Sequence, residues 1–173
     1  MNTIDLTLER VAAPDGAPFE ELLVVTERGT LKALDFGGYE ARMHALLTRR
    51  VPGYRLVPGR SEVPHALNAY FAGDLKALDA LAVAPGGTEF QDAAWRALRS
   101  IPAGSTATYA EQAQRIGRPA AVRAVGAANG RNPIAIVLPC HRVVGKSGDL
   151  TGYAGGIMTK QWLLEHERRH TSH

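Results

Sequence analysis

The sequence LPCHRV, residues 138–143, holds the only cysteine of the chain, Cys140, and we take it as the centre of the molecule. The residues before it, 134–138, are all apolar and predict a short buried strand. Pro139 closes that run, because proline has no backbone N–H with which to extend a strand. Cys140 is therefore expected in a loop just past a strand, where reactive side chains are often placed.

A lone cysteine is more often a buried structural residue than a nucleophile. Its neighbours His141 and Arg142 favour the nucleophile, since cationic or hydrogen-bonding surroundings stabilise the thiolate. Adjacent residues of an extended chain point to opposite sides, so His141 reaches the sulfur only through a tight turn or a bridging water. The sequence leaves the resting protonation of Cys140 open, although a relay would lower its pKa.

Length and composition describe an ordinary soluble globular protein of one domain or two small ones: 173 residues, 45% hydrophobic and 21% charged. One cysteine excludes an internal disulfide, and the six histidines form no ligand-spaced cluster. His166 and His170, four apart on an expected helix, could hold a metal, but two solvated histidines near the C-terminus explain them more simply. We expect no metal and no cofactor. No apolar run approaches a membrane span, and the start of the chain lacks the features of a signal peptide. We expect a cytoplasmic protein.

Charge is unevenly distributed along the chain, whose formal net charge is +3. From Gly86 onward there are eleven Lys and Arg against six Asp and Glu, whereas the preceding residues carry nine against eleven. A basic C-terminal half that also carries the cysteine suggests a polyanionic partner, although a few solvated charges would look similar.

The first half of the chain predicts an α/β domain spanning residues 1–84. The expected elements are a hairpin over 19–36, a helix over 39–50, a strand over 54–57 and a helix from the cap Ser61 to about Phe71. The segment Ala84-Pro85-Gly86-Gly87 is the best domain boundary, since glycines after a proline make a flexible joint. The second domain is expected over residues 88–169.

The second domain opens with capping signals of three helices. Thr88 and Gln91 form a capping box, as do Thr108 and Glu111 at the start of a helix that Gly117 stops. Pro119 then predicts the start of another helix, ending near Gly130. Two short helices joined by a glycine turn are typical of a helix-turn-helix. We therefore expect an α/β N-terminal domain followed by a mostly α-helical C-terminal domain with a helix-turn-helix and a short active-site strand.

The second helix of this pair consists mainly of alanine and glycine, and Arg123 is its one long polar side chain. Reading bases in the major groove normally requires several long donors and acceptors. A smooth helix instead allows close approach to the minor groove, with Arg123 free to enter the base stack. The alternative, a tightly packed core helix with one arginine reaching solvent, explains the composition equally well.

Together these motifs resemble the O6-alkylguanine-DNA alkyltransferases. The resemblance runs without a gap from about Thr88 to Glu167. It is carried by RAVG at 123–126, NP at 132–133, PCHRV at 139–143, GYAGG at 152–156 and WLL at 162–164. The first half resembles the variable N-terminal domain of that family only in size and element order.

The resemblance implies a role for each site residue. Cys140 would attack the alkyl carbon of a guanine flipped out of the duplex. His141 and Glu167 would complete a relay in which a water joins the thiol to the imidazole, and Asn132 would hold the turn before the cysteine. Tyr109 would contact the DNA and donate to N3 of the leaving guanine.

The same resemblance implies two further sets of residues, one that contacts DNA and one that lines the base pocket. The helix surface expected on DNA consists of Arg123, Tyr109, Ala124, Gly126, Ala127, Gly130 and Arg131. The base pocket is expected to be lined by Tyr153, Ala154, Pro139 and Val143. Ala154 departs from relatives that have serine there, which leaves the tolerance for larger alkyl groups open. The family's metal-binding cysteines are missing from the N-terminal half, so no metal is expected.

The expected partner is double-stranded DNA that contains O6-alkylguanine, bound by a monomer, with cooperative loading left open. Attack on a saturated carbon forms a thioether, which has no ready route back to the thiol. We therefore expect an irreversible, single-turnover alkyl transfer. Three rivals remain: a non-catalytic binder of alkylated DNA, against which Cys140 speaks; a cysteine hydrolase, which an adjacent His141 serves badly; and a helix-turn-helix regulator with an inert cysteine.

Overall fold

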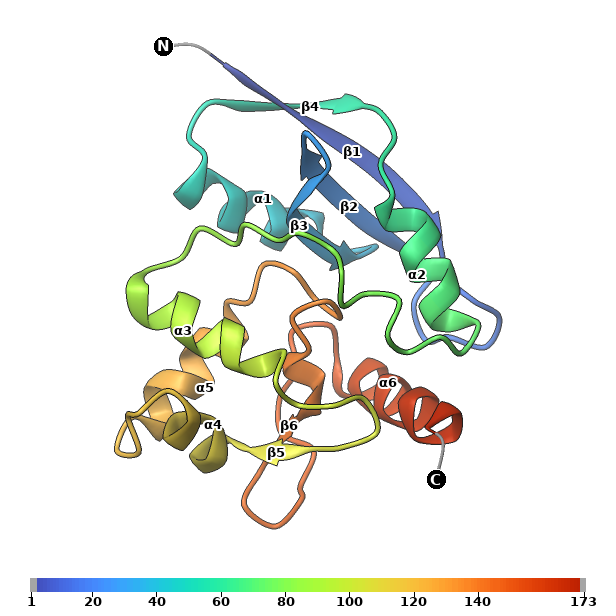
Figure 1. Cartoon of the computed structure of the whole chain (residues 1–173). Helices are drawn as coiled ribbons and strands as arrows, with labels where there is room; N and C mark the ends of the chain where they lie inside the picture. The colour runs from blue at the N-terminus through green and yellow to red at the C-terminus, as the bar shows by residue number, and fades with distance from the viewer. Residues whose placement is uncertain (1–2, 172–173) are drawn as a thin grey trace.

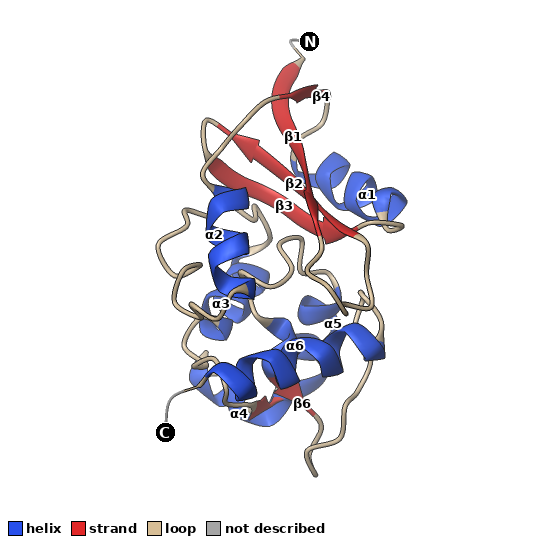
Figure 2. Ribbon diagram, turned by 90° about the vertical axis from the view of Figure 1, so that its right-hand side faces the viewer, coloured by secondary structure: helices blue, strands red, loops and turns tan. Residues whose placement is uncertain are grey.

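The computed structural model describes residues 3–171 and divides them into a sheet-containing half and a helical half (Figure 1). Met1 and Asn2, which belong to the segment searched for a signal peptide, lie outside the described residues. Figure 2 shows the sheet at one end of the molecule and the helices α3 to α6 toward the other. None of the described helices is long and apolar enough to cross a membrane.

The N-terminal half is a four-stranded sheet in the order β3-β2-β1-β4, with β4 parallel to β1 and the other pairs antiparallel. The strands are β1 (Ile4–Ala12), β2 (Glu21–Glu27), β3 (Thr30–Phe36) and β4 (Tyr54–Pro58), and the helices are α1 (Glu40–Arg50) and α2 (Val63–Phe71). The hairpin, both helices and β4 fall where the sequence predicts them. The first strand, β1, was not among the expected elements.

Strand β2 explains how the two halves share one core. Leu23 and Val25 face α1, whereas Leu22 and Val24 face the main cluster that also contains Trp95 of the helical half. A strand buried on both faces must be apolar at successive positions, as the run LLVV is. The sheet therefore has α1 on one face and the C-terminal half against the other.

As far as residue 171, the C-terminal half contains four α-helices and two very short parallel strands. These are α3 (Glu89–Leu98), β5 (Ala107–Thr108), α4 (Tyr109–Arg115), α5 (Val122–Gly130), the 3₁₀ turn η1 (Cys140–Arg142), β6 (Val143–Val144) and α6 (Ile157–His170). Both predicted capping boxes form, with reciprocal side-chain and backbone bonds at Thr88 and at Thr108. Helix α5 begins at Val122 rather than near Pro119, because Arg118 to Ala121 form a turn.

The predicted strand over residues 134–138 is wrong. Ile134 makes a single bridge to Leu34, and the chain then turns, with Ile136 at φ 69°. Apolar residues fill this segment because it is buried on all sides, and burial alone does not distinguish a strand from a buried turn. The short strand next to the cysteine is β6, which pairs Val143 with Ala107 of β5.

Candidate active site

The turn between α5 and Cys140 is held together by the side chain of Asn132, which is 2% exposed. Its amide nitrogen donates to the carbonyl of Leu138 at 2.7 Å and to Sγ of Cys140 at 3.1 Å. Its amide oxygen accepts from the backbone N–H of Ile134 at 2.9 Å. One side chain thus closes the turn and places a hydrogen-bond donor on the thiol.

The N-terminal sheet supports the same turn from outside. Leu34 on the edge strand β3 donates to the carbonyl of Pro133 at 2.9 Å and accepts from the N–H of Ala135 at 3.0 Å. Arg42 of α1 donates to the carbonyls of Gly130 and Asn132 at 3.0 and 3.1 Å. No motif in the sequence identified Arg42 or Leu34, because both contacts join segments about 90 to 100 positions apart through the backbone.

The thiol of Cys140 is partly buried at the first position of η1. Burial raises its pKa above the ordinary value, while the Asn132 hydrogen bond and the charges of Lys160 and Arg42 act in the opposite direction. In the protein without DNA, burial therefore outweighs the groups that would lower this pKa. Arg142 is not the cation that acts on the sulfur, because its guanidinium is engaged by Glu167.

His141 is the next residue of η1 and is completely buried. Its Nε2 is 2.8 Å from Oε2 of Glu167, and its Nδ1 is a buried atom without a hydrogen-bond partner among the described residues. Burial lowers the pKa of His141 and so favours the neutral ring, although Glu167 opposes this. A neutral imidazole that donates from Nε2 keeps the lone pair of Nδ1 free, and can act as a base there.

Glu167 of α6 is also completely buried and receives four side-chain contacts. Arg142 donates from Nε to Oε1 at 2.8 Å and from Nη2 to Oε2 at 2.9 Å, and Tyr70 donates to Oε2 at 2.6 Å. Burial alone would raise the pKa of Glu167, but His141 and Arg142 outweigh it and hold that pKa far below the ordinary value. The carboxylate is therefore ionised. Tyr70 of α2 was missed, since its sequence context is that of a core aromatic.

The helix pair α4 and α5 is locked by buried amides. Gln112 and Asn129 exchange two hydrogen bonds, at 2.9 and 2.7 Å, and Trp95 of α3 donates to the carbonyl of Ala128 at 2.8 Å. The buried face of α5 is Val125, Ala128 and Asn129. Its opposite face contains the residues expected on DNA: Arg123, Ala124, Ala127, Gly130 and Arg131 are exposed, and Gly126 is half-buried. Helix α5 is thus a core helix on one side and a smooth surface on the other.

The residues expected around the base lie on segments next to the cysteine. Pro139 and Val143 are buried, and Tyr153 and Ala154 are half-buried in the loop before α6. The Tyr153 hydroxyl is a buried atom without a hydrogen-bond partner among the described residues. The hydroxyl of Tyr109, at the start of α4, is 2.7 Å from that of Thr151. The structure therefore brings Tyr109 to the same loop that carries Tyr153.

Gly155 explains why this loop can lie so close to the sheet. A Cβ added at Gly155 would lie 2.5 Å from the ring of Phe36 in β3, a separation that atoms do not tolerate. Phe36 in turn meets Tyr153 edge to face, with ring centroids 6.1 Å apart. Among the three glycines of the GYAGG motif, Gly155 is thus required by its packing against Phe36 of the N-terminal half.

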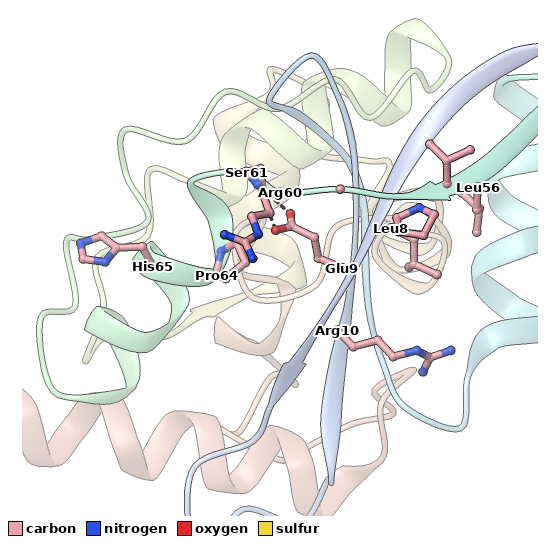
Figure 3. A pocket seen from close by; sticks show the side chains of 11 residues that line it. Leu8, Glu9, Arg10, Leu56, Arg60, Ser61, Pro64 and His65 are labelled. Carbon is pink, nitrogen blue, oxygen red and sulfur yellow. Dashed lines mark hydrogen bonds between the residues drawn. The ribbon is translucent and has the colours of Figure 1, made fainter.

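A separate hollow of about 840 Å³ lies on the N-terminal half, between β1, β4 and the start of α2 (Figure 3). Glu9 points across it but already accepts from the N–H of Ser61 at 2.9 Å and from its hydroxyl. All its lining residues belong to residues 8–65, so this hollow is distinct from the site around Cys140. Among residues 3–171, no group of three or more His, Cys, Asp or Glu side chains could hold a metal ion.

The class of protein to which this site belongs follows from the relatives of the chain. Residues 89–169 match the family described as "6-O-methylguanine DNA methyltransferase, DNA binding domain". The chain is 47% identical over 163 residues to the methylated-DNA–protein-cysteine methyltransferase of Salmonella typhimurium. The aligned region covers 92% of this chain and 94% of that relative. The chain belongs to the methylated-DNA–protein-cysteine methyltransferase family.

Solved structures agree. A structure of Mycobacterium tuberculosis OGT in complex with DNA matches 96% of this chain and 94% of that chain, with 38% identity and a TM-score of 0.77. The O6-methylguanine-DNA methyltransferase of Pyrococcus kodakaraensis matches 94% of this chain and 98% of that chain, with 29% identity and a TM-score of 0.74. These comparisons confirm the predicted family and the predicted combination of an α/β half with a helical half.

Proposed function

We propose that this protein repairs DNA by moving the alkyl group from O6 of a guanine to Sγ of Cys140, once per molecule. The observation that supports this best is the buried arrangement around the thiol. Asn132 donates to Sγ, and the neighbouring His141 has one nitrogen fixed on the ionised Glu167 and the other unpaired. A nucleophile, a base and an orienting carboxylate are the three parts that thiol activation requires.

In the proposed reaction, Sγ attacks the alkyl carbon as the bond from that carbon to O6 breaks, and the electron pair of that bond passes to the guanine. The thiol proton passes through a water to Nδ1 of His141, and the resulting imidazolium is stabilised by Glu167. The leaving guanine gains a proton, with the Tyr109 phenol as the donor. The raised pKa of Cys140 fits this sequence, since the thiol then ionises as the substrate arrives rather than at rest.

The surface that we propose for DNA is the exposed face of α5. Its small residues Ala124, Ala127 and Gly130 allow a close approach to the minor groove, with Arg131 beside them for the phosphates. Arg123 is exposed on the same helix and would fill the space that the flipped guanine leaves in the stack. The flipped base would enter between Tyr153, Ala154, Pro139 and Val143.

Intact-mass spectrometry tests the proposal. The protein is incubated with excess duplex DNA containing one O6-methylguanine, beside the Cys140→Ser variant. We expect a gain of one methyl group per protein molecule, located on Cys140 by peptide mapping and lacking in the variant. Tight, lesion-selective binding without a mass change would instead make the chain a non-catalytic binder of alkylated DNA.

We further infer that the protein acts as a monomer, since Asn132, Cys140, His141 and Glu167 of one chain make the contacts around the thiol and require no residue of a second copy. We also propose that it acts in the cytoplasm, because its proposed substrate is DNA. Sedimentation of the protein with duplexes of increasing length tests the monomer and cooperative loading together. A monomer without DNA that saturates long duplexes over a narrow concentration range would indicate cooperativity.

A further inference from the structure

Thr151 connects two elements that the proposed reaction uses and that are otherwise separate. Its hydroxyl is 2.7 Å from the hydroxyl of Tyr109 at the start of α4. Its carbonyl accepts from Nζ of Lys160 in α6 at 3.4 Å, and the same Nζ donates to the carbonyl of Val143 at 2.6 Å. Thr151 thus links α4 and, through Lys160, α6 to the strand that follows Cys140.

The segment around Thr151 has few other supports. The chain between β6 and α6 contains no helix or strand in the described structure, and residues 146–149 are exposed. Its first part is a tight turn, closed by the N–H of Gly145 on the carbonyl of Asp149 at 2.8 Å. The loop then passes through Thr151 to Tyr153 two residues later. The contacts of Thr151 therefore fix the point at which the loop reaches the pocket.

Lys160 provides a second argument that the contacts of Thr151 fix the loop, because the residue that binds the Thr151 carbonyl is itself only 1% exposed. Burial lowers its pKa, and burying an ammonium group is unfavourable unless hydrogen bonds compensate. The compensation comes from the carbonyls of Val143 and Thr151, on the two sides of the loop. The loop is therefore closed by a buried cation and not only by packing.

The chemistry gives the Thr151 hydroxyl a specific task. A hydroxyl can donate and accept at once, so Thr151 can donate to the Tyr109 oxygen while the proton of Tyr109 stays free for the base. A hydrogen bond to the phenol oxygen also stabilises the negative charge that develops there as the phenol gives up its proton. The phenol regains a proton from solvent and the His141 imidazolium releases its proton to solvent, so that the sum of the steps is the loss of one proton from the thiol and the gain of one by the guanine.

We propose that Thr151 is a positioning residue for Tyr109: its hydroxyl aims the phenol at the leaving base and its carbonyl, held by Lys160, sets the loop that lines the pocket. This inference rests on the proposed function, in which Tyr109 donates to the leaving base. Thr151 itself touches no reacting atom, and nothing in the sequence motifs had distinguished it from a solvated loop residue.

The test compares Thr151→Val, which keeps the shape and removes the hydroxyl, with Thr151→Ser, which keeps the hydroxyl. Single-turnover methyl transfer is measured with saturating duplex that contains one O6-methylguanine, together with the Kd for that duplex. We expect Thr151→Val to be slower by about tenfold, a part of what a general acid contributes. Thr151→Ser should transfer the methyl group at nearly the wild-type rate, and both variants should bind the duplex with the wild-type Kd.

A double-mutant cycle with Tyr109→Phe separates the possible failures. If Thr151 acts through Tyr109, Thr151→Val causes no further loss in the Tyr109→Phe background. A full additional loss, or a wild-type rate for Thr151→Val beside a slow Tyr109→Phe, overturns the role of Thr151 and leaves that of Tyr109 intact. A wild-type rate for Tyr109→Phe instead removes the role of Tyr109 from the proposed function, and this inference with it.

Alkylation of Cys140 by iodoacetamide distinguishes positioning from general damage, because this reagent has no leaving base for Tyr109 to protonate. We expect Thr151→Val to react with iodoacetamide at the wild-type rate. A parallel loss in both reactions would show that the substitution disturbs the whole site and would overturn the inference. If Thr151→Val does not fold, Thr151→Ala is measured in the same way with the same criteria.

Discussion

Glu167 is the residue on which the buried polar centre depends, since Arg142, His141 and Tyr70 all contact it. Replacing it by glutamine keeps the size but leaves the Arg142 guanidinium buried without its counter-charge. Breaking a buried ion pair from one side costs about 3–5 kcal/mol. We expect Glu167→Gln to lose about this much free energy of unfolding at pH 7. Glu165→Gln, which breaks only a surface pair with Arg168 on the same helix, should lose less than about 1 kcal/mol.

Glu167 should also make the free energy of unfolding depend on pH. The pKa of Glu167 is lower in the folded than in the unfolded protein, so its contribution is complete above the unfolded value of about 4.3 and is lost as the pH falls toward the folded value. The stability difference between wild type and Glu167→Gln should therefore shrink as the pH falls below about 4.3. Urea unfolding from pH 3 to 7 measures it. A difference that does not change with pH would show that the carboxylate is not held ionised.

Asn132 is expected to affect the reactivity of the Cys140 thiol. Its amide donates to Sγ, and this bond is one of the forces that oppose the rise of the Cys140 pKa on burial. We expect Asn132→Ala to raise that pKa further and to slow alkylation by iodoacetamide at pH 8, by about tenfold for each pKa unit. The pH dependence of the reaction, followed by intact mass, measures the shift. Asn68→Ala, an exposed position on α2, is the control and should react as wild type does.

At the scale of single residues, the sequence identified the site residues that belong to a recognisable motif. It missed the residues that contact them from distant segments of the chain. Asn132 contacts Cys140, and His141, the next residue, contacts Glu167. The relay that the resemblance implied through these residues stays a prediction. Tyr70 and Lys160 are as closely engaged, yet each reads locally as an ordinary helix residue. Their roles depend on contacts between distant segments, which no local pattern encodes.

Among the elements, α5 carries a prediction that separates surface from stability. Ala127 is exposed on the face proposed for DNA, and leucine is nearly as good a helix former as alanine. Ala127→Leu should therefore leave the free energy of unfolding within about 0.5 kcal/mol of wild type. It should also weaken duplex binding, because a branched side chain prevents the close approach that a smooth helix allows.

Ala45→Leu is the matched control for this element, since Ala45 is exposed within α1 of the N-terminal half. Duplex affinity is measured by fluorescence anisotropy at one fixed salt concentration, because phosphate contacts make the affinity salt-dependent. Equal affinities for Ala127→Leu and Ala45→Leu would remove the exposed face of α5 from the DNA surface.

Helices and strands could be predicted from the sequence where residues close together in the chain determine their start or end. The capping boxes at Thr88 and Thr108 place two helix starts correctly because the cap is formed by residues three positions apart. The run 134–138 misled because five apolar residues fit a strand and a buried turn equally, and Ile136 adopts a positive φ that β-branched residues rarely accept. Such a conformation is imposed by the surroundings, here by Asn132 and the β3 edge.

On the scale of the whole molecule, the N-terminal half acts as a support for the catalytic turn. Arg42 carries much of this contact, since it pairs with Asp35 at 2.7 Å and donates to the carbonyls of Gly130 and Asn132. Its charge also counteracts the rise of the Cys140 pKa. The two halves therefore meet at the turn that leads to Cys140, which gives the N-terminal half a structural role next to the site.

Arg42→Leu tests this coupling in the full-length chain. The substitution removes both carbonyl contacts and leaves the mostly buried Asp35 without its partner, so we expect the free energy of unfolding to fall by about 3–5 kcal/mol. Methyl transfer should slow as well, because the turn around Asn132 loses its outer support and the thiol loses a favourable charge. Arg49→Leu removes an exposed arginine from the same helix and should change neither property.

Adding Asp35→Asn to Arg42→Leu should recover part of the lost free energy of unfolding, since it removes the unpaired carboxylate, but it should not recover the rate of methyl transfer. Recovery of both would show that Arg42 serves only to balance Asp35, and that the turn holds Cys140 in place without help from the sheet.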